Sequence, residues 1–119
     1  MSIDAGNATL NLQADVGDIT PLDSLSIITD SIDDDGNTGN GRRLSVEVNV
    51  EGLLSMNSRR GINQTAGKVV AEELLLLGGE TSGVFSLTQA SNDFGIVAAD
   101  TTASDTGNDP ITLVDSNTI

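Results

Sequence analysis

The chain has 119 residues, and its 18 acidic side chains against five basic ones give a formal net charge of −13. It contains no cysteine, which excludes disulfides, a thiol nucleophile and thiolate metal sites. Such an acidic surface is a poor match for nucleic acid or an anionic membrane, because phosphate groups are bound by clustered lysine and arginine. No stretch approaches the roughly 18 apolar residues of a transmembrane helix, so membrane insertion is not expected.

Alternating apolar and polar residues predict strands through most of the chain. Residues 10–16 alternate in this way, and residues 44–50 (LSVEVNV) give the cleanest period of two. Shorter apolar runs follow at residues 84–88, 96–99 and 111–114. Clusters of Gly, Asn, Asp and Ser separate them, which is turn chemistry.

Helix signals are scarce. The best candidate covers residues 68–77 (KVVAEELLLL), but Gly67 and the pair Gly78-Gly79 bound it closely. Ten residues are few for a stable helix. A pair of strands joined by a small bend fits the same residues.

The fold class is therefore predicted to be all-β. Few of the turns are two-residue hairpins, so the chain is expected to keep winding in one direction as a parallel β-solenoid. Residues 1–119 would form a single solenoid segment with loop insertions near 29–41 and 101–110. The alternative is a β-sandwich of cadherin-like or bacterial Ig-like type, in which strands pair antiparallel and the polar stretches are ordinary long loops.

A series of motifs in the second half of the chain has an informative order. GINQTAG at residues 61–67 precedes the apolar run that ends at residue 77, and VFSLT at 84–88, ASNDFG at 90–95 and VAA at 97–99 follow. This order resembles the repeats of filamentous-haemagglutinin-like exoproteins, the adhesins exported by two-partner secretion or as autotransporters. The resemblance extends over about two-thirds of the chain and is weakest in the two insertions.

The resemblance implies a right-handed parallel β-helix that is secreted or held at the outer-membrane surface as part of a longer exported chain. It implies a non-catalytic structural or adhesive role. The partner would be a surface glycan or protein receptor, or copies of the chain itself stacked end to end, because open solenoid ends are sticky. Asn92 is expected at a corner with its amide bonded to neighbouring backbone, and Gln64 is a second candidate for that part.

The acidic stretch offers one candidate metal site. Asp30, Asp33, Asp34 and Asp35 could hold Ca²⁺ in an irregular loop, although the spacing of an EF-hand fails at both ends. A solvated acidic turn is the simpler interpretation, since charge runs usually face water. No other cofactor is expected, and a calcium-binding sandwich module is the first alternative function.

An enzyme is not expected. The carboxylates of Asp33, Asp34, Asp93 and Asp100 could cleave glycosidic bonds in a fragment of a β-helical polysaccharide-active enzyme, which is the second alternative. However, the chain has no Tyr and no Trp to build a sugar platform.

Overall fold

A computed structural model describes residues 1–6, 9–12, 14–29, 31–33, 43–58, 61–78, 84–100 and 111–116 of the chain. Within these ranges the regular structure consists of β-strands, with no helix. The prediction of an all-β chain is thereby confirmed. The strands in chain order are β1 (Ser2–Asp4), β2 (Thr9–Asn11), β3 (Leu25–Thr29), β4 (Ser31–Asp33), β5 (Arg43–Leu44), β6 (Val48–Asn49), β7 (Leu53–Ser58), β8 (Gly61–Gln64), β9 (Val69–Gly78), β10 (Val84–Leu87), β11 (Asp93–Asp100) and β12 (Ile111–Leu113).

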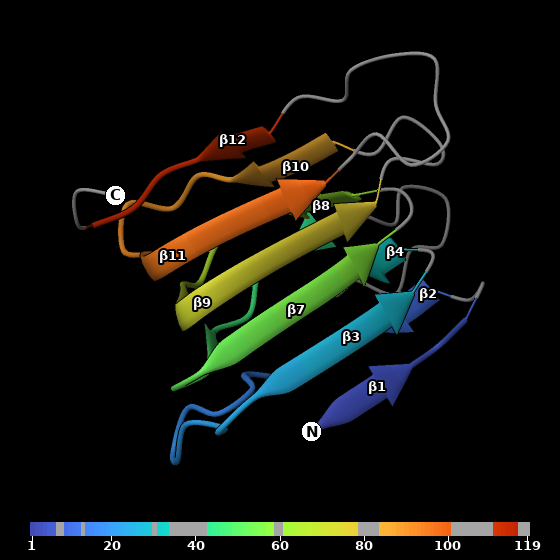
Figure 1. Cartoon of the computed structure of the whole chain (residues 1–119), viewed down its shortest axis with the longest axis horizontal. Coiled ribbons are helices and arrows are strands. Elements are labelled where there is room, and N and C mark those ends of the chain that lie inside the picture. The colour runs from blue at the N-terminus through green and yellow to red at the C-terminus, as the bar shows by residue number, and fades with distance from the viewer. Residues whose placement is uncertain are drawn as a thin grey trace.

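Every strand pair among the described residues is parallel (Figure 1). One sheet has the order β1-β3-β7-β9-β11, with β6 also paired to β9. A second sheet has the order β12-β10-β8-β5, and β2 pairs with β4. The chain is thus a parallel β-solenoid with about three turns that carry strands on every face, as predicted. The sandwich alternative was wrong, because it requires antiparallel pairs.

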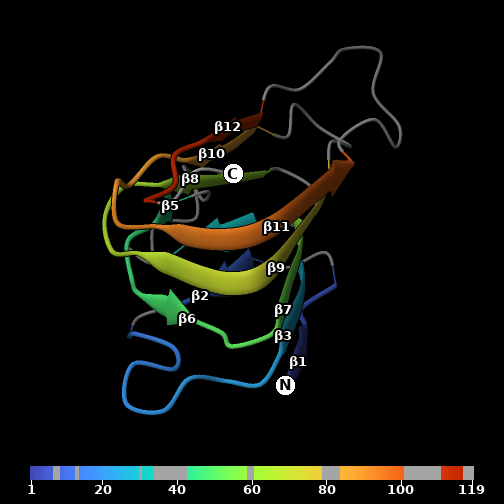
Figure 2. The same ribbon diagram turned by 60° about the vertical axis from the view of Figure 1, so that its left-hand side comes forward.

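The solenoid has three faces, and single strands bend around one of its corners. The long face consists of β1, β3, β7, residues 73–78 of β9 and residues 96–100 of β11. The second face carries β5, β8, β10 and β12. The third face carries β6 and the first residues of β9 and β11, and Figure 2 shows these two strands curving from one face to the next.

The bend in β9 explains the ambiguous sequence at residues 68–77. The burial of β9 alternates on both sides of two successive exposed residues, Glu72 and Glu73. Successive side chains in a straight strand point to opposite faces, so two successive exposed residues mark a bend in the strand. Beyond the bend, every second side chain again points into the core. The helix candidate was wrong, and the expected bend is present, but the residues form one bent strand rather than a pair.

Aliphatic ladders fill the interior of the long face. Leu25, Leu54 and Leu74 occupy one ladder, and Ile27, Met56 and Leu76 the next. All six are at most 2% exposed. Because each buried side chain of this size contributes about 1.5–3 kcal/mol, the ladders are a large part of what holds the turns together, and the buried Phe85 and Phe94 add to the same core.

The strand expected at residues 44–50 is interrupted by a corner. The structure divides it into β5 and β6, and the chain bends at Val46. Leu44 and Val48 are both buried, but they cover two different faces. Alternation therefore continued through a change of direction, which a period of two cannot reveal.

The two predicted insertions lie mainly outside the described residues. Residues 101–110 fall wholly outside them, between β11 and β12. Within 29–41 the structure describes Thr29, at the end of β3, and β4, which pairs with β2.

Candidate functional site

A buried amide pair closes the corner between the second and third faces. The Gln64 side chain donates from Nε2 to Asn92 Oδ1 at 2.8 Å, and Asn92 Nδ2 donates to Gln64 Oε1 at 2.7 Å. Asn92 is fully buried and Gln64 is 3% exposed. A reciprocal pair of this kind satisfies two polar groups that would be costly to bury alone.

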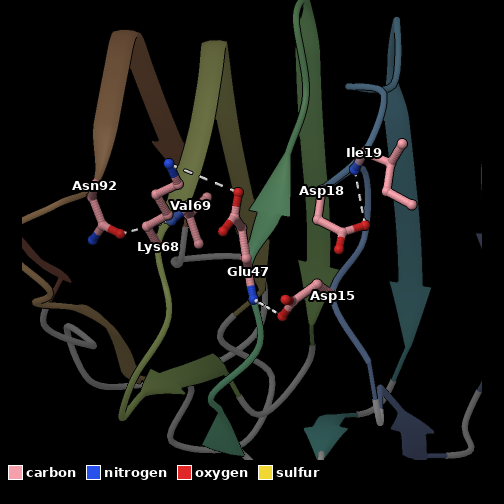
Figure 3. A network of polar contacts seen from close by, with 7 residues as sticks. All are labelled: Asp15, Asp18, Ile19, Glu47, Lys68, Val69 and Asn92. Carbon is pink, nitrogen blue, oxygen red and sulfur yellow. Dashed lines mark hydrogen bonds and ion pairs between the residues drawn. The ribbon is translucent and has the colours of Figure 1, made fainter.

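The same pair also serves the backbone of two turns. Asn92 Oδ1 accepts a hydrogen bond from the Val69 backbone N–H at 2.8 Å, as Figure 3 shows, and Gln64 Oε1 accepts one from Gln89 N–H at 3.2 Å. The expectation that Asn92 and Gln64 act as corner residues is therefore confirmed. Their role in the described structure is to join turns, since both amides face inward.

A series of polar contacts lies on the solvent-facing surface along the same side of the solenoid. Asp15 Oδ1 accepts a hydrogen bond from Glu47 N–H at 2.8 Å, and Glu47 Oε1 lies 3.8 Å from Lys68 Nζ (Figure 3). The Lys68 side chain is 43% exposed, so this ion pair is screened by water and adds little stability. The arrangement is a link between successive turns.

The outer surface of the long face presents side chains in registered columns. The middle column consists of Ser2, Ser26, Ser55, Leu75 and Ala98, which lie directly above one another. The column is polar in the first turns and apolar in the last two. Parallel pairing fixes this order, because each strand places the corresponding residue at the same height on the face.

The apolar half of this face is extended by neighbouring residues. Leu77 follows Leu75 on β9, and Ile96 precedes Ala98 on β11. Ile96 is 64% exposed, an unusual exposure for an isoleucine in the middle of a strand. We call Leu75, Leu77, Ile96 and Ala98 the outer apolar patch.

Acidic residues border the outer apolar patch. Glu73 lies between Leu53 and Ile96 in one column, and Asp100 is the neighbour of Leu77 in the other. No basic residue occupies a described outward position of these columns. The face combines exposed hydrocarbon with negative charge, which suits a neutral or cationic partner.

The sequence-predicted site residues do not form a site among the described residues. Asp30, Asp34 and Asp35 lie outside them, and of Asp33 only the backbone, in β4, is described. The calcium hypothesis therefore stays a prediction. Asp93 and Asp100 stand at opposite ends of the eight-residue strand β11 rather than side by side. Among the described residues no group of three or more acidic side chains is arranged to hold a metal ion.

The outer face was not found from the sequence. Its middle rests on β3 and β7, whose outward residues are serine, asparagine and aliphatic residues rather than charged groups, so no strand was predicted there. The recurring serine at Ser26 and Ser55 is the signal that could have aligned the two strands.

Within the described residues no helix is long and apolar enough to cross a membrane. No protein-family model matches the chain, and comparisons with curated proteins and with solved structures also found no match. The evidence for the parallel β-solenoid is accordingly the strand pairing of the chain itself.

Proposed function

We propose that this chain is a non-catalytic structural and adhesive segment of a larger secreted or surface-displayed bacterial exoprotein, similar to the filamentous-haemagglutinin-like adhesins. The parallel solenoid supports the proposal, because that is the fold the resemblance implies. The motif residues support it too: Gln64 and Asn92 form the buried corner pair, and Gly67 takes a left-handed corner conformation with φ of 75°. Each residue type suits its place, because the amides satisfy buried polar groups at the corner and glycine adopts a left-handed conformation at no steric cost.

The outer face of the long sheet carries the adhesive part of the proposal. Its residues stand on five stacked strands whose inward side chains are packed in ladders, so the face is rigid before any partner arrives. A preformed surface loses little conformational entropy on binding. The exposed outer apolar patch supplies the area that a partner would cover.

The partner in this proposal is a surface glycan or a protein receptor. Apolar side chains beside Glu73 and Asp100 favour a neutral glycan face or a protein surface with lysine or arginine around apolar residues. An anionic glycan would meet like charge.

To test the proposal, surface plasmon resonance measures binding of the chain to immobilised neutral glycans, anionic glycans and extracellular-matrix proteins. Ile96→Lys changes the outer apolar patch, and Asn63→Lys, at an exposed position of β8 on the second face, is the matched control. We expect Ile96→Lys to weaken binding at least tenfold and Asn63→Lys to leave it unchanged. Equal loss in both variants, or no binding to any of these surfaces, would contradict the proposal.

A test for polysaccharide cleavage separates the proposal from the enzymatic alternative. The chain is incubated with the glycans that it binds, and the release of reducing ends is followed. We expect no release above that of a buffer blank. Turnover that is lost on replacing Asp93 or Asp100 by Asn would instead establish a polysaccharide-active enzyme.

A further inference from the structure

A carboxylate without a partner lies within the apolar part of the long face. Glu73 on β9 stands in one outward column between Leu53 on β7 and Ile96 on β11. Leu53 is 40% exposed and Ile96 64% exposed, and Glu73 is itself exposed. Within the described ranges the Glu73 carboxylate takes part in no hydrogen bond or ion pair. A negative charge is therefore presented to solvent between two aliphatic side chains.

This surface belongs to the interior of the sheet and not to its edge. β9 is hydrogen-bonded to β7 on one side and to β11 on the other, as Figure 1 shows. Leu75, the next outward residue of β9, is partly exposed although strands flank it on both sides. The apolar side chains around Glu73 thus face outward because of strand alternation, and they would do so in a sheet of any length.

The corner beside Glu73 adds further negative charge. Glu72 is also exposed at the bend of β9, and Glu51 is exposed at the same corner one turn earlier, where Gly52 O accepts a hydrogen bond from Glu73 N–H at 3.2 Å. Gly95 stands over Glu72, since a Cβ on this glycine would lie 2.4 Å from the Glu72 carbonyl oxygen. Neither glycine has a side chain that could cover the carboxylates, so a cation can approach them from solvent.

The described cations of the chain do not neutralise this corner. Lys68, the only basic side chain that the structure describes, lies 3.8 Å from the Glu47 carboxylate, before β9 begins. The amino group of Met1 donates to the Ser24 carbonyl oxygen at 2.9 Å, with β3 and β7 between it and β9. The charge of Glu73 is therefore left for a partner to neutralise.

Three classes of partner would use this surface differently. A neutral glycan brings hydroxyl groups but no charge for Glu73, and the chain has no Tyr or Trp to stack on a sugar ring. A second copy would bring its own carboxylates to the contact, in a chain of net charge −13. A lysine or arginine lays its aliphatic stem along apolar neighbours while its charged head reaches a carboxylate. This last class matches both the hydrocarbon and the charge.

We propose that the outer face binds a protein segment in which a lysine or arginine is flanked by apolar side chains. The cation pairs with Glu73, and the flanking side chains cover Leu53 and the outer apolar patch. The inference rests on the proposed adhesive function and names its partner as a basic, apolar stretch of protein rather than a glycan. Apolar burial supplies the area of the contact, and the charge pair selects the partner.

The first experiment identifies the preferred partner chemistry without assuming a sequence. Phage that display random peptides are selected on the full 119-residue chain and, in parallel, on Glu73→Lys. We expect the unmodified chain to enrich peptides with lysine or arginine beside leucine, isoleucine or an aromatic residue, and Glu73→Lys to lose them. Enrichment of uncharged or acidic peptides on the unmodified chain, or of none, would overturn the proposal.

A matched pair of variants separates local pairing from net charge. Glu73→Gln and Asp18→Asn each remove one negative charge. Asp18 lies between Val16 and Leu22, which pair with the third face, and asparagine keeps an acceptor for Ile19 N–H. For an enriched peptide made synthetically, calorimetry should show a Kd raised about tenfold or more by Glu73→Gln and by less than about twofold by Asp18→Asn. Equal losses would show a response to net charge alone and would overturn the proposal.

A double-mutant cycle tests whether the cation meets Glu73. The basic residue of the peptide is replaced by methionine, which keeps an apolar stem without the charge. With this peptide Glu73→Gln should change Kd by less than about twofold, because the partner of the carboxylate is already absent. A loss of the same size with both peptides would mean that Glu73 does not pair with that residue. Circular dichroism confirms that each variant folds.

The two proposals can fail separately. Ile96→Lys should abolish peptide binding, because it places an ammonium group in the same column beside Glu73. If Ile96→Lys removes binding to a neutral glycan, Glu73→Gln does not, and no basic peptide is enriched, the proposed function stands and this inference fails. If glycans, matrix proteins and peptides all fail to bind, the proposed adhesive function fails as well.

Discussion

Gln64 and Asn92, 28 residues apart in the chain, exchange two hydrogen bonds through their side-chain amides inside the corner of the solenoid. Each also accepts a hydrogen bond from a backbone N–H, of Gln89 and Val69 respectively. Successive turns are thus joined at this corner by side chains as well as by the strand pairing on either side of it.

Removal of the Asn92 amide should destabilise the fold strongly. Asn92→Ala leaves the Val69 N–H and the Gln64 Nε2 donor without these partners in a buried corner, and each buried orphan costs about 1–3 kcal/mol. We expect a loss of about 3 kcal/mol in the free energy of unfolding, measured by urea denaturation. Asn63→Ala, at an exposed position next to Gln64, is the control and should change the value by less than about 0.5 kcal/mol. A similar small change in both variants would mean that the amide pair contributes nothing.

Substitution of two glycines should distinguish the cost of a left-handed backbone from the cost of a steric clash. Gly67 has φ of 75°, and a Cβ there would lie 2.6 Å from the Val46 carbonyl oxygen. Gly6 has φ of 57° but no atom within 4 Å of the corresponding position. Gly6→Ala should therefore cost only the left-handed conformation, about 1–2 kcal/mol, and Gly67→Ala clearly more. Thermal unfolding of the two variants gives the comparison, and equal midpoints would show that the corner can move to admit a methyl group.

Adjacent leucines on β9 should respond very differently to truncation. Leu76 is 0% exposed within the ladder, so Leu76→Ala creates a cavity and should cost about 2–5 kcal/mol. Leu77 is half-buried on the outer face, and Leu77→Ala should cost less than about 1 kcal/mol. Chemical denaturation of both variants decides. Reversed costs would mean that the inward and outward sides of this strand have been exchanged.

If the chain serves as an aliphatic scaffold, Ca²⁺ should leave its stability unchanged. A ligand that binds only the folded state raises its stability by RT ln(1 + [L]/Kd), so a real site would raise the thermal midpoint by several degrees in millimolar Ca²⁺. We expect the same midpoint with Ca²⁺ and with chelator, followed by far-ultraviolet circular dichroism. A rise that disappears in a variant with Asp33, Asp34 and Asp35 replaced by Asn would establish the acidic stretch as a calcium site.

The corner residues could be predicted because their chemistry is local. Asn92 and Gln64 lie beside glycine-rich bends, where a buried amide is the simplest way to satisfy turning backbone. The winding direction could be inferred for a related reason, since bends without hairpin signals favour parallel stacking. The choice between a helix and a bent strand at residues 68–77 needed the tertiary structure, because only neighbouring turns decide which way Glu72 and Glu73 point.

The strands that carry the outer face could not be predicted from the same signals. β3 and β7 contain Ser26 and Ser55 at outward positions, where a soluble sheet usually has charged residues. At Val46 the error was the opposite one, because a single strand was predicted where the chain turns a corner. Val46 continues the alternation of apolar and polar residues through that corner. Position within a solenoid depends on the turn above and below, and that information is absent from a local window of sequence.

The stacking order has a mechanical consequence. β1 and β11 lie at opposite ends of the long sheet, so tension applied between them acts along the backbone hydrogen bonds and loads the turns in series. Under such tension a solenoid should yield one turn at a time from an exposed end. A turn of 20 residues, as from Met56 to Leu76, would release about 60–70 Å of extended chain. The molecule would then lengthen in steps under load while its remaining turns kept their shape.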